Sequence, residues 1–435
     1  MSKLVVGLIL AGLVGSTVPP RAAGATPAQT DAPPTEIPLV ALPEAPPPVG
    51  LPMLQAQVSC PLLQNRVQRI VGGEASVWSI TVADAQGRVL ADLNGARSRV
   101  PASNQKLVST AYALDQLGPD YRLRTQMWRL SDGSFRLTGE GDPDLALPQL
   151  QRFVKLAMAR SRSAEPGATP GSLVRVQLAE EPARAWWPTG WEPDDRFYAY
   201  GAPITRLALT SNAIQSAVSN PPDRLRSLLN KALQQQGGQA QLSLVAATSP
   251  LPGDAALIHE EPSAPMHNLL SLANTESHNF TAEVLLRQAA GTWDLNQARQ
   301  RVSRWLTEQG LPMEGVIIAD GSGLDRGNRL TSRFLAALLL RMNQHPYASQ
   351  YLASMAIAGR RGTLRNLYVG TPVEGRFYAK TGTLTGVRAI SGTLSTNDGL
   401  RHISAISNGA MAPNSTIGQL VTQVLNTSLC PSRTI

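Results

Sequence analysis

The middle of this 435-residue chain differs in pattern from the two stretches that flank it, and this difference is the strongest constraint on its fold. Residues 121–256 alternate short strand-like pieces with glycine and proline turns, around one helix near Arg224–Gln235. The stretches before and after them combine helices with paired strands. The sequence therefore predicts one α/β domain, built from residues 59–120 and 257–435, with a mostly β insertion at residues 121–256.

The flanking segments show the hydrophobic periods of helices and strands. Helices are predicted at Ser103–Leu117, Met266–Asn274, Phe280–Gln288, Leu295–Gln309 and Arg333–Asn343. Strands are predicted at Val77–Val82, Arg88–Leu93, Gly375–Lys380, Val387–Ser395 and Arg401–Ser407. Strand-like pieces of the insertion are Phe135–Thr138, Val174–Leu178 and Leu242–Ala246. No fixed-period repeat is visible, which argues against a solenoid or a propeller.

The N-terminal segment has the features of an export signal. A short positive start precedes the apolar run Leu4–Val18, and Ala23-Gly24-Ala25 matches a signal-peptidase site. The run is shorter than the roughly 20 residues that span a bilayer. We therefore expect a signal peptide at residues 1–25, no transmembrane anchor in the mature chain, and a periplasmic or cell-envelope location. Residues 26–58 are rich in Pro and Ala, which predicts a disordered tether.

Composition narrows the class of protein. Two cysteines exclude a disulfide-dense scaffold; outside the cytosol Cys60 and Cys430 either pair or remain two thiols. The five histidines show no metal-binding spacing, so we expect neither a metal nor a cofactor. The net charge of +8 suits an anionic partner, but an aromatic content of 5% without Arg–aromatic interleaving argues against nucleic acid.

Three short motifs carry candidate chemistry, and the first is Ser103-Asn104-Gln105-Lys106. Residues three apart on a helix share a face, so the Lys106 amine can reach the Ser103 hydroxyl. A serine becomes a good nucleophile when a base accepts its proton, and a lysine with a lowered pKa can be that base. An ordinary capping serine followed by a surface lysine is the alternative.

The second motif is Ser277-His278-Asn279, in the turn between two predicted helices. A hydroxyl and an amide two residues apart supply a proton-relay group and a hydrogen-bonding group from one turn. A simple helix cap, which both residue types favour, is the alternative.

The third motif is Lys380-Thr381-Gly382-Thr383, at the end of a strand-like run. A cation and two hydroxyls on an edge strand can hold the carboxylate of an extended peptide that lies antiparallel to it. Gly382 would let such a peptide approach the backbone closely. A strand end followed by a turn is the alternative.

Together and in this order, the three motifs resemble those of the penicillin-binding proteins and serine β-lactamases. Other pieces resemble one branch, the D-alanyl-D-alanine carboxypeptidase/endopeptidase family of penicillin-binding protein 4 type (peptidase family S13). These are residues 101–107, 139–145, 200–203, 320–324, 329–331, 362–365 and 379–384. They follow the family order from about Ala75 to Asn408, so the resemblance covers most of the mature chain.

This resemblance implies a fold and a reaction. The fold is the serine β-lactamase/penicillin-binding transpeptidase-like α/β (α+β) fold, an antiparallel sheet flanked by helices. The reaction is hydrolysis of the terminal D-Ala-D-Ala bond of peptidoglycan stem peptides, with D-Ala–meso-diaminopimelate cross-links left open as a second substrate. Ser103 would attack with Lys106 as base, and the N–H groups of Ser103 and Thr383 would form the oxyanion hole. β-Lactam antibiotics would acylate the same serine as inhibitors.

The remaining roles also follow from the resemblance. Ser277 would relay a proton to the leaving amine with the help of Lys380, whose charge would also lower the pKa of Lys106. Asn279 would hold the amide on the acyl side of the substrate. Thr381 and Thr383 would bind the terminal carboxylate.

Two departures from the family pattern concern substrate preference. His278 stands where aspartate is common, and an acidic substrate-contacting residue of some members has only Glu180-Glu181 as nearby candidates. Two other functions stay open: a β-lactamase, which uses the same motifs but deacylates fast, and a non-catalytic cell-wall-binding protein.

Overall fold

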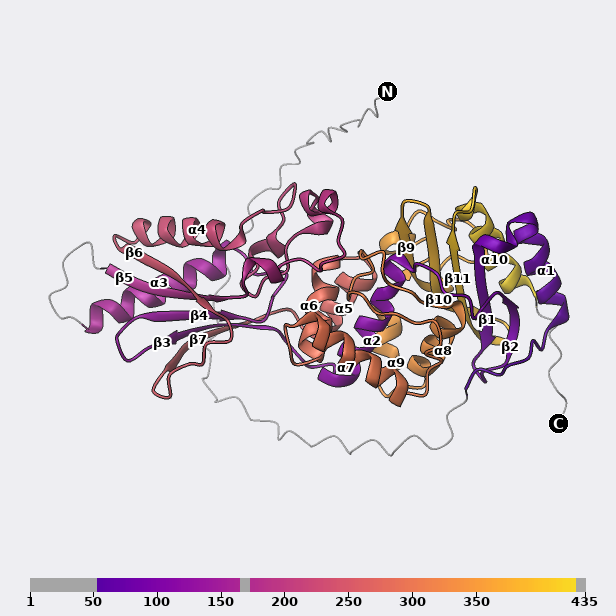
Figure 1. Cartoon of the computed structure of the whole chain (residues 1–435), viewed down its shortest axis with the longest axis horizontal. Coiled ribbons are helices and arrows are strands. Elements are labelled where there is room, and N and C mark those ends of the chain that lie inside the picture. The colour runs from indigo at the N-terminus through magenta and orange to yellow at the C-terminus, as the bar shows by residue number, and fades with distance from the viewer. Residues whose placement is uncertain (1–52, 165–172, 428–435) are drawn as a thin grey trace, which may run out of the picture. The chain divides into compact units, whose positions relative to one another are not determined.

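The computed structural model describes residues 53–164 and 173–427, which contain two β-sheets (Figure 1). The first sheet is antiparallel throughout, with the strand order β2-β1-β11-β10-β9-β8. Its strands are β1 (Trp78–Asp84), β2 (Val89–Leu93), β8 (Ala356–Ile357), β9 (Phe377–Leu384), β10 (Val387–Thr396) and β11 (Gly399–Asn408). Because β1 and β11 are hydrogen-bonded neighbours, segments from both ends of the chain form one sheet.

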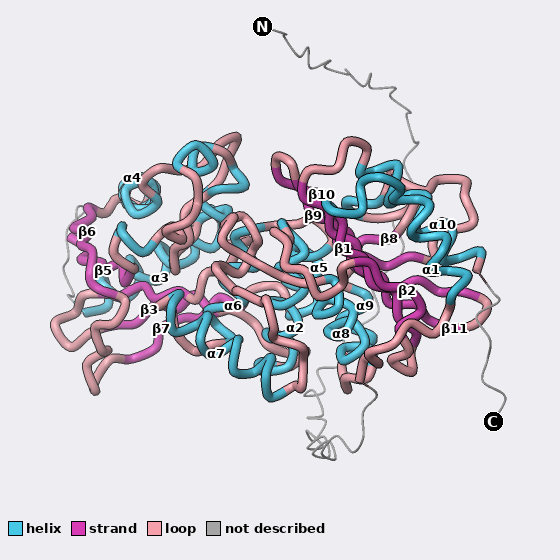
Figure 2. Tube along the Cα trace, turned by 45° about the vertical axis from the view of Figure 1, so that its right-hand side comes forward, coloured by secondary structure: helices cyan, strands magenta, loops and turns pink. Residues whose placement is uncertain are grey.

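Helices cover both faces of this sheet (Figure 2). On one face lie α1 (Pro61–Val71) and α10 (Pro413–Asn426), which share an apolar cluster with the strands. On the other face lie α2 (Lys106–Leu117), α5 (Met266–Asn274), α6 (Asn279–Ala289), α7 (Leu295–Glu308), α8 (Ser332–Asn343) and α9 (Ala348–Ala353). The predicted fold, an antiparallel sheet flanked by helices, is confirmed.

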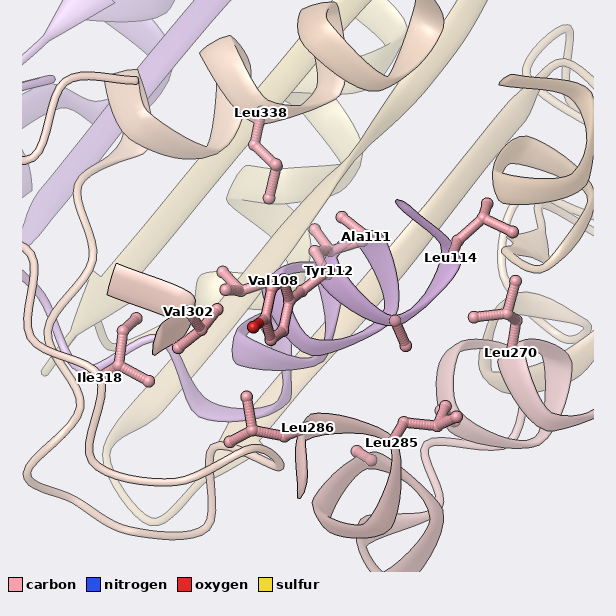
Figure 3. Close-up of a cluster of buried hydrophobic side chains, with 14 of the residues drawn as sticks. Val108, Ala111, Tyr112, Leu114, Leu270, Leu285, Leu286, Val302, Ile318 and Leu338 are labelled. Carbon is pink, nitrogen blue, oxygen red and sulfur yellow. The ribbon is translucent and has the colours of Figure 1, made fainter. Parts of the chain in front are cut away.

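Helix α2 is the centre of the larger apolar cluster (Figure 3). Every residue of this helix from Lys106 to Leu114 is buried. The side chains around it come from four other helices: Leu270 of α5, Leu286 of α6, Val302 of α7 and Leu338 of α8. Close packing on all sides leaves the helix little freedom to shift, so groups on its first turn keep fixed positions.

The second sheet contains five strands in the order β6-β5-β4-β3-β7. Its strands are β3 (Arg124–Arg129), β4 (Phe135–Gly139), β5 (Leu173–Glu180), β6 (Gln239–Ala246) and β7 (Ala256–Pro262). Helices α3 (Leu147–Ala164) and α4 (Pro221–Gln235) pack on it around Phe153 and Leu229. Helix α3 was not expected from the sequence, although its apolar residues recur every three or four positions.

Short 3₁₀ helices connect these elements. They are η1 (Gly72–Val77), η2 (Ala102–Gln105), η3 (Ala183–Ala185), η4 (Pro193–Phe197), η5 (Ala199–Gly201), η6 (Leu209–Asn212) and η7 (Gly362–Leu364). Three of them, η2, η5 and η7, contribute to the candidate site.

The expected signal peptide, residues 26–52 of the expected tether, and Cys430 lie outside the described residues. The last residues of the expected tether contact the first sheet region: the N–H of Gln55 donates to the Gly87 carbonyl, and Val58 forms a parallel bridge with Val89 of β2. Within residues 53–164 and 173–427, no helix has both the length and the apolar character to cross a bilayer.

Candidate active site

The Ser103 hydroxyl and the Lys106 amine meet at the start of α2. Ser103 lies in η2, and Lys106 is the first residue of α2. Because the two residues are three apart on continuous helical backbone, Lys106 Nζ lies 2.9 Å from Ser103 Oγ. Ser103 is partly exposed, whereas Lys106 is fully buried. The structure thus brings these two groups together, as their spacing predicted.

The turn that carries Ser103 has an unusual backbone conformation. Ala102 has a φ of 48°, in the left-handed region that non-glycine residues rarely adopt. Two glycines pack against this turn: a Cβ on Gly323 would lie 1.9 Å from the Ala102 carbonyl oxygen, and one on Gly382 would lie 2.7 Å from that of Pro101. Gly382 therefore lets β9 approach the nucleophile turn, a packing role beside the substrate approach expected from the sequence.

Three hydrogen-bond acceptors surround the Lys106 amine. Nζ lies 2.6 Å from Asn279 Oδ1, 2.7 Å from the Ser322 carbonyl oxygen and 2.9 Å from Ser103 Oγ. Only the serine can also donate, because amide and carbonyl oxygens carry no proton. A neutral amine therefore keeps its two N–H bonds to those oxygens and presents its lone pair to the Ser103 hydroxyl. This arrangement suits a base that takes the proton of Ser103.

Burial lowers the pKa of Lys106 to about 7, against the opposing effect of the negative charges of Asp320 and Glu283. An ammonium group loses its hydration in the core, so the neutral form gains population. A general base works best when its pKa lies near the working pH. Lys106 meets this condition close to neutrality.

Glu283 on α6 fixes the backbone that accepts the Lys106 hydrogen bond. Its Oε1 accepts from the N–H groups of Gly321 and Ser322, each at 2.8 Å. Its Oε2 forms a buried ion pair with Arg287 at 2.7 Å. The Ser322 carbonyl is therefore held in place from behind. No sequence signal pointed to Glu283, except that an acid and an arginine four residues apart interrupt an otherwise apolar helix.

Asp320 organises the same turn from the other side. Its carboxylate accepts from the N–H groups of Gly323 and Asp325, from Asn328 Nδ2 and from the indole of Trp191. With so many donors, the acid defines the shape of the turn around residue 322. From the sequence, residues 320–324 only resembled a family piece, and no role for Asp320 was predicted.

The second buried amine, Lys380 on β9, pairs with the second serine. Its Nζ donates to Ser277 Oγ at 2.9 Å and to the Thr381 carbonyl at 2.8 Å. Burial, and then the positive charge of Lys106, lowers the pKa of Lys380 well below its usual range. The positive charge of Lys106 thus acts on Lys380, whereas the lowered pKa of Lys106 comes from burial and not from the charge of Lys380, which is the cause that the family resemblance implied.

Asn104 connects the nucleophile turn to the sheet. In the orientation that satisfies its amide, the nitrogen donates to the Lys380 carbonyl at 2.7 Å and the oxygen accepts from the N–H of Ile390 at 3.2 Å. Asn104 is fully buried, so these bonds have no competition from water. They set the spacing between the first and third motifs.

The second motif contributes a neutral ring and an amide. Burial, followed by the charge of Lys106, lowers the pKa of His278 to about 4, and its Nδ1 lies 2.8 Å from Thr281 Oγ1. Asn279 Nδ2 donates to the carbonyl of Tyr200, which lies in η5 within the inserted segment. The inserted segment thus reaches a residue of the candidate site, a contact that sequence reasoning missed.

The free edge of β9 borders a cavity of about 600 Å³. Within the described residues, β8 pairs with β9 only at Tyr378 and Ala379, so the following residues have no strand partner on that side. Thr381, Gly382 and Thr383 line the cavity, and Thr381 Oγ1 donates to Thr363 Oγ1 at 2.8 Å. This placement suits the carboxylate-binding role expected for the two motif threonines.

The acids of the inserted segment have other partners. Glu180 accepts from the N–H groups of Glu181, Arg206 and Leu207, and Glu181 pairs with Arg206 at 2.7 Å. Both carboxylates therefore serve the local structure, and neither is placed as a substrate contact. In the described parts of the chain, no group of three His, Cys, Asp or Glu side chains could hold a metal ion.

Known proteins resemble this chain in sequence and in fold. A D-alanyl-D-alanine carboxypeptidase of an Actinomadura species is 28% identical, over 78% of this chain and 79% of the relative. A carboxypeptidase DacB of Mycolicibacterium smegmatis is 30% identical over 76% of each. The crystal structure of penicillin-binding protein 4 from Haemophilus influenzae has a TM-score of 0.70 at 17% identity, covering 83% of this chain and 98% of that one. That structure supports the fold alone.

A family model agrees with these likenesses. The model of the D-Ala-D-Ala carboxypeptidase 3 (S13) family matches residues 63–223 and 210–425. These matches span both sheets and all three motifs. The chain therefore belongs to the D-Ala-D-Ala carboxypeptidase 3 (S13) family, as the order of its motifs predicted.

Proposed function

We propose that the protein is an exported serine DD-peptidase that hydrolyses the terminal D-Ala-D-Ala bond of peptidoglycan stem peptides through an acyl-enzyme on Ser103. The family to which the chain belongs is one of serine hydrolases with D-Ala-D-Ala carboxypeptidase activity. One observation carries the assignment of Ser103: among the three acceptors of the Lys106 amine, its hydroxyl alone can give up a proton.

Acylation begins with neutral Lys106. Its lone pair accepts the Ser103 proton while Ser103 Oγ attacks the carbonyl carbon of the penultimate D-Ala. Negative charge then develops on the carbonyl oxygen. The N–H groups of Ser103 and Thr383 are proposed to stabilise it, a contribution of about 3–4 kcal/mol for each such donor in comparable enzymes.

Collapse of the tetrahedral intermediate requires a proton for the leaving amine. Ser277 is proposed to supply it, and the support is that Lys380 Nζ donates to its hydroxyl and can replace the proton that it gives. The leaving D-Ala carries its own carboxylate, for which Thr381 and Thr383 offer hydroxyls beside the cavity. The proton that Lys106 took from Ser103 replaces the one that Lys380 gave, so both amines are restored. Neutral Lys106 then accepts a proton from the water that attacks the ester and returns it to Ser103 Oγ as the acyl group leaves.

Penicillin tests this proposal, because it mimics the substrate and leaves the acyl-enzyme slowly. Mass spectrometry of the protein incubated with penicillin should show one adduct, located on Ser103. The adduct should disappear in Ser103→Ala and persist in Ser349→Ala, which removes an exposed hydroxyl on α9. An adduct that survives in Ser103→Ala would refute the assignment, and rapid turnover of nitrocefin would favour a β-lactamase.

A further inference from the structure

Trp191, in the inserted segment, contacts the turn that accepts a hydrogen bond from Lys106. Its indole Nε1 donates to Asp320 Oδ2 at 2.9 Å, and the residue is fully buried. The same carboxylate oxygen accepts from the Ser322 hydroxyl at 3.1 Å. The Ser322 carbonyl in turn accepts from Lys106 Nζ at 2.7 Å. Two contacts therefore connect Trp191 with the residue that holds the amine.

Tyr200, nine residues further along, reaches the other N–H acceptor of the amine through its backbone. Asn279 Nδ2 donates to the Tyr200 carbonyl at 2.8 Å, and Asn279 Oδ1 lies 2.6 Å from Lys106 Nζ. An amide turned by 180° would present N–H groups to the amine, and these cannot accept a hydrogen bond from it. The Tyr200 carbonyl therefore sets the orientation of Asn279 that keeps an acceptor facing Lys106.

Residues 191–201 are connected closely enough to hold both contacts together. Arg196 Nη2 donates to the Trp191 carbonyl at 3.1 Å, and the Tyr200 hydroxyl donates to Asp195 Oδ1 at 2.8 Å. A Cβ on Gly201 would collide with the Asp195 carbonyl oxygen, so η5 packs directly on η4. One short stretch of chain therefore reaches both N–H acceptors of the proposed base.

The contact at Asp320 concerns a charge that acts on Lys106. The negative charge of Asp320 raises the pKa of Lys106 more than that of Glu283 does, both against the larger effect of burial. The positive charge of Lys106 in turn lowers the pKa of Lys380 and of His278. An N–H bond to a carboxylate offsets part of its negative charge. The indole N–H therefore limits how far Asp320 favours the protonated amine.

Asp320 would keep its place without the indole. Its carboxylate also accepts from the N–H groups of Gly323 and Asp325 and from Asn328 Nδ2. These bonds preserve the shape of the turn. The effect of the indole N–H on Lys106 is therefore electrostatic and can be measured separately from the packing of the turn.

We propose that residues 191–201 of the inserted segment are a positioning element for the proposed base. Trp191 acts through Asp320. The Tyr200 carbonyl acts through Asn279. The inference rests on the proposed function, because it concerns the base of the same reaction. It assigns a chemical role to a segment that lies outside both parts of the predicted catalytic domain.

The first test removes the indole N–H. Trp191→Phe keeps an aromatic ring in place and deletes one donor to Asp320. The pH midpoint of acylation by penicillin should rise by about half to one unit from a wild-type value of about 7. This shift should lower the rate at pH 7 about two- to fivefold, and the rate should return to the wild-type value at about pH 9. Stopped-flow acylation across this range measures both.

Trp186→Phe is the matched control. Trp186 is buried in the same inserted segment, and its Nε1 donates to the Glu181 carbonyl at 2.9 Å. The substitution therefore deletes an indole bond of the same length that does not reach Asp320. Both variants should lower the Tm by similar amounts, but only Trp191→Phe should move the pH midpoint.

The second test displaces the Tyr200 carbonyl. Because a Cβ at residue 201 collides with backbone, Gly201→Ala should shift η5 and release the Asn279 amide. The high-pH plateau of the acylation rate should fall about tenfold, because Lys106 no longer directs its lone pair at the nucleophile. Gly253→Ala, also in the inserted segment, meets no heavy atom within 4 Å and should change the rate less than about twofold.

Three outcomes would overturn the inference. They are a folded Trp191→Phe protein with the wild-type midpoint, an equal shift in Trp186→Phe, and a folded Gly201→Ala protein with the wild-type plateau. If Trp191→Phe does not fold, the two glycine variants decide. Failure of penicillin to label Ser103 of the wild-type protein would instead refute the proposed function, so the two failures are distinguishable.

Discussion

Two buried glutamates, one in the region of each sheet, accept backbone N–H groups in the same way but have different effects on their surroundings. Glu283, behind the candidate site, accepts two backbone N–H groups at 2.8 Å. Glu180, at the end of β5, accepts from Arg206 and Leu207 at 2.8 and 2.9 Å. Burial raises the pKa of both carboxyls, that of Glu180 to about 7. Each acid fastens a neighbouring segment to the element that carries it.

The difference lies in what surrounds each acid. The negative charge of Glu283 raises the pKa of Lys106. Glu283 also forms an ion pair with Arg287 in the core. Glu180 has no buried amine among the groups that shift its pKa. A change at Glu283 therefore alters the protonation of the proposed base, whereas a change at Glu180 alters only the attachment of a loop. The same bond pattern supports the proposed base in one region and the local fold in the other.

The largest effect on the acylation rate should come from replacing the buried lysine of the first region, compared with an exposed lysine of the second. Lys106→Met removes the proposed base and should slow acylation by penicillin about a thousandfold, since general bases contribute 10²- to 10⁴-fold. Lys155→Met, on the exposed surface of α3, should leave the rate unchanged. Stopped-flow acylation measures both, with thermal melting as the check on folding. Fast acylation in a folded Lys106→Met protein would mean that the base lies elsewhere.

The glutamates themselves provide the sharpest comparison. Acylation should rise with pH through about 7 in the wild type, because the neutral form of Lys106 is the active one. Glu283→Gln removes a charge that raises this pKa, so the midpoint should move to lower pH. It also leaves Arg287 buried and unpaired, at a cost of about 3–5 kcal/mol in unfolding free energy.

Glu180→Gln is the matched variant. It should lower the unfolding free energy by about 1–3 kcal/mol, the usual cost of a buried N–H left without a partner, and leave the pH midpoint in place. Rate–pH profiles and denaturant melts of the two variants distinguish the regions. Equal shifts of the pH midpoint in both variants would show that Glu180 influences Lys106 as much as Glu283 does.

A smaller effect should follow from His278. The ring is neutral at pH 7, because burial and the charge of Lys106 hold its pKa at about 4. His278→Asp, which restores the residue common in the family, places a negative charge near both amines and should raise the acylation midpoint by about one pH unit. His278→Asn, of similar size and uncharged, should not move it. The same profiles in both variants would show that charge at this position has no influence on Lys106.

Strongly periodic elements were predictable from the sequence alone. Helix α5 has the predicted bounds, and strand β10 begins at the predicted residue, because their apolar residues repeat with a single period. Strand β7 was missed because His259, Glu260 and Glu261 give it a polar sequence at the edge of its sheet. Helix α10 was missed although Ile417, Leu420, Val421 and Val424 mark its buried face, since Gly418 interrupts the pattern.

Some contacts of the candidate site were likewise predictable from the sequence, and others were not. The contact between Ser103 and Lys106 follows from helical spacing, and so it could be read directly. The contact between Ser277 and Lys380 joins residues about a hundred positions apart, so only the resemblance to a family suggested it. Residues 200–203 resembled a family piece, but the role of the Tyr200 carbonyl could not be predicted, because any residue type can supply a backbone acceptor. The proposed roles of the site residues and the domain boundaries remain predictions.

Gly323 and Gly382 pack against the Ser103 turn from two sides, and this packing determines which positions tolerate substitution. A larger residue at either position collides with backbone, so the nucleophile cannot be re-aimed by single substitutions there. Around Gly418 and the exposed Thr383, by contrast, new side chains meet open space or solvent. Substitutions should therefore be tolerated on the leaving-group side of the scissile bond and not around the nucleophile. Drug or substrate selectivity should accordingly evolve on the leaving-group side.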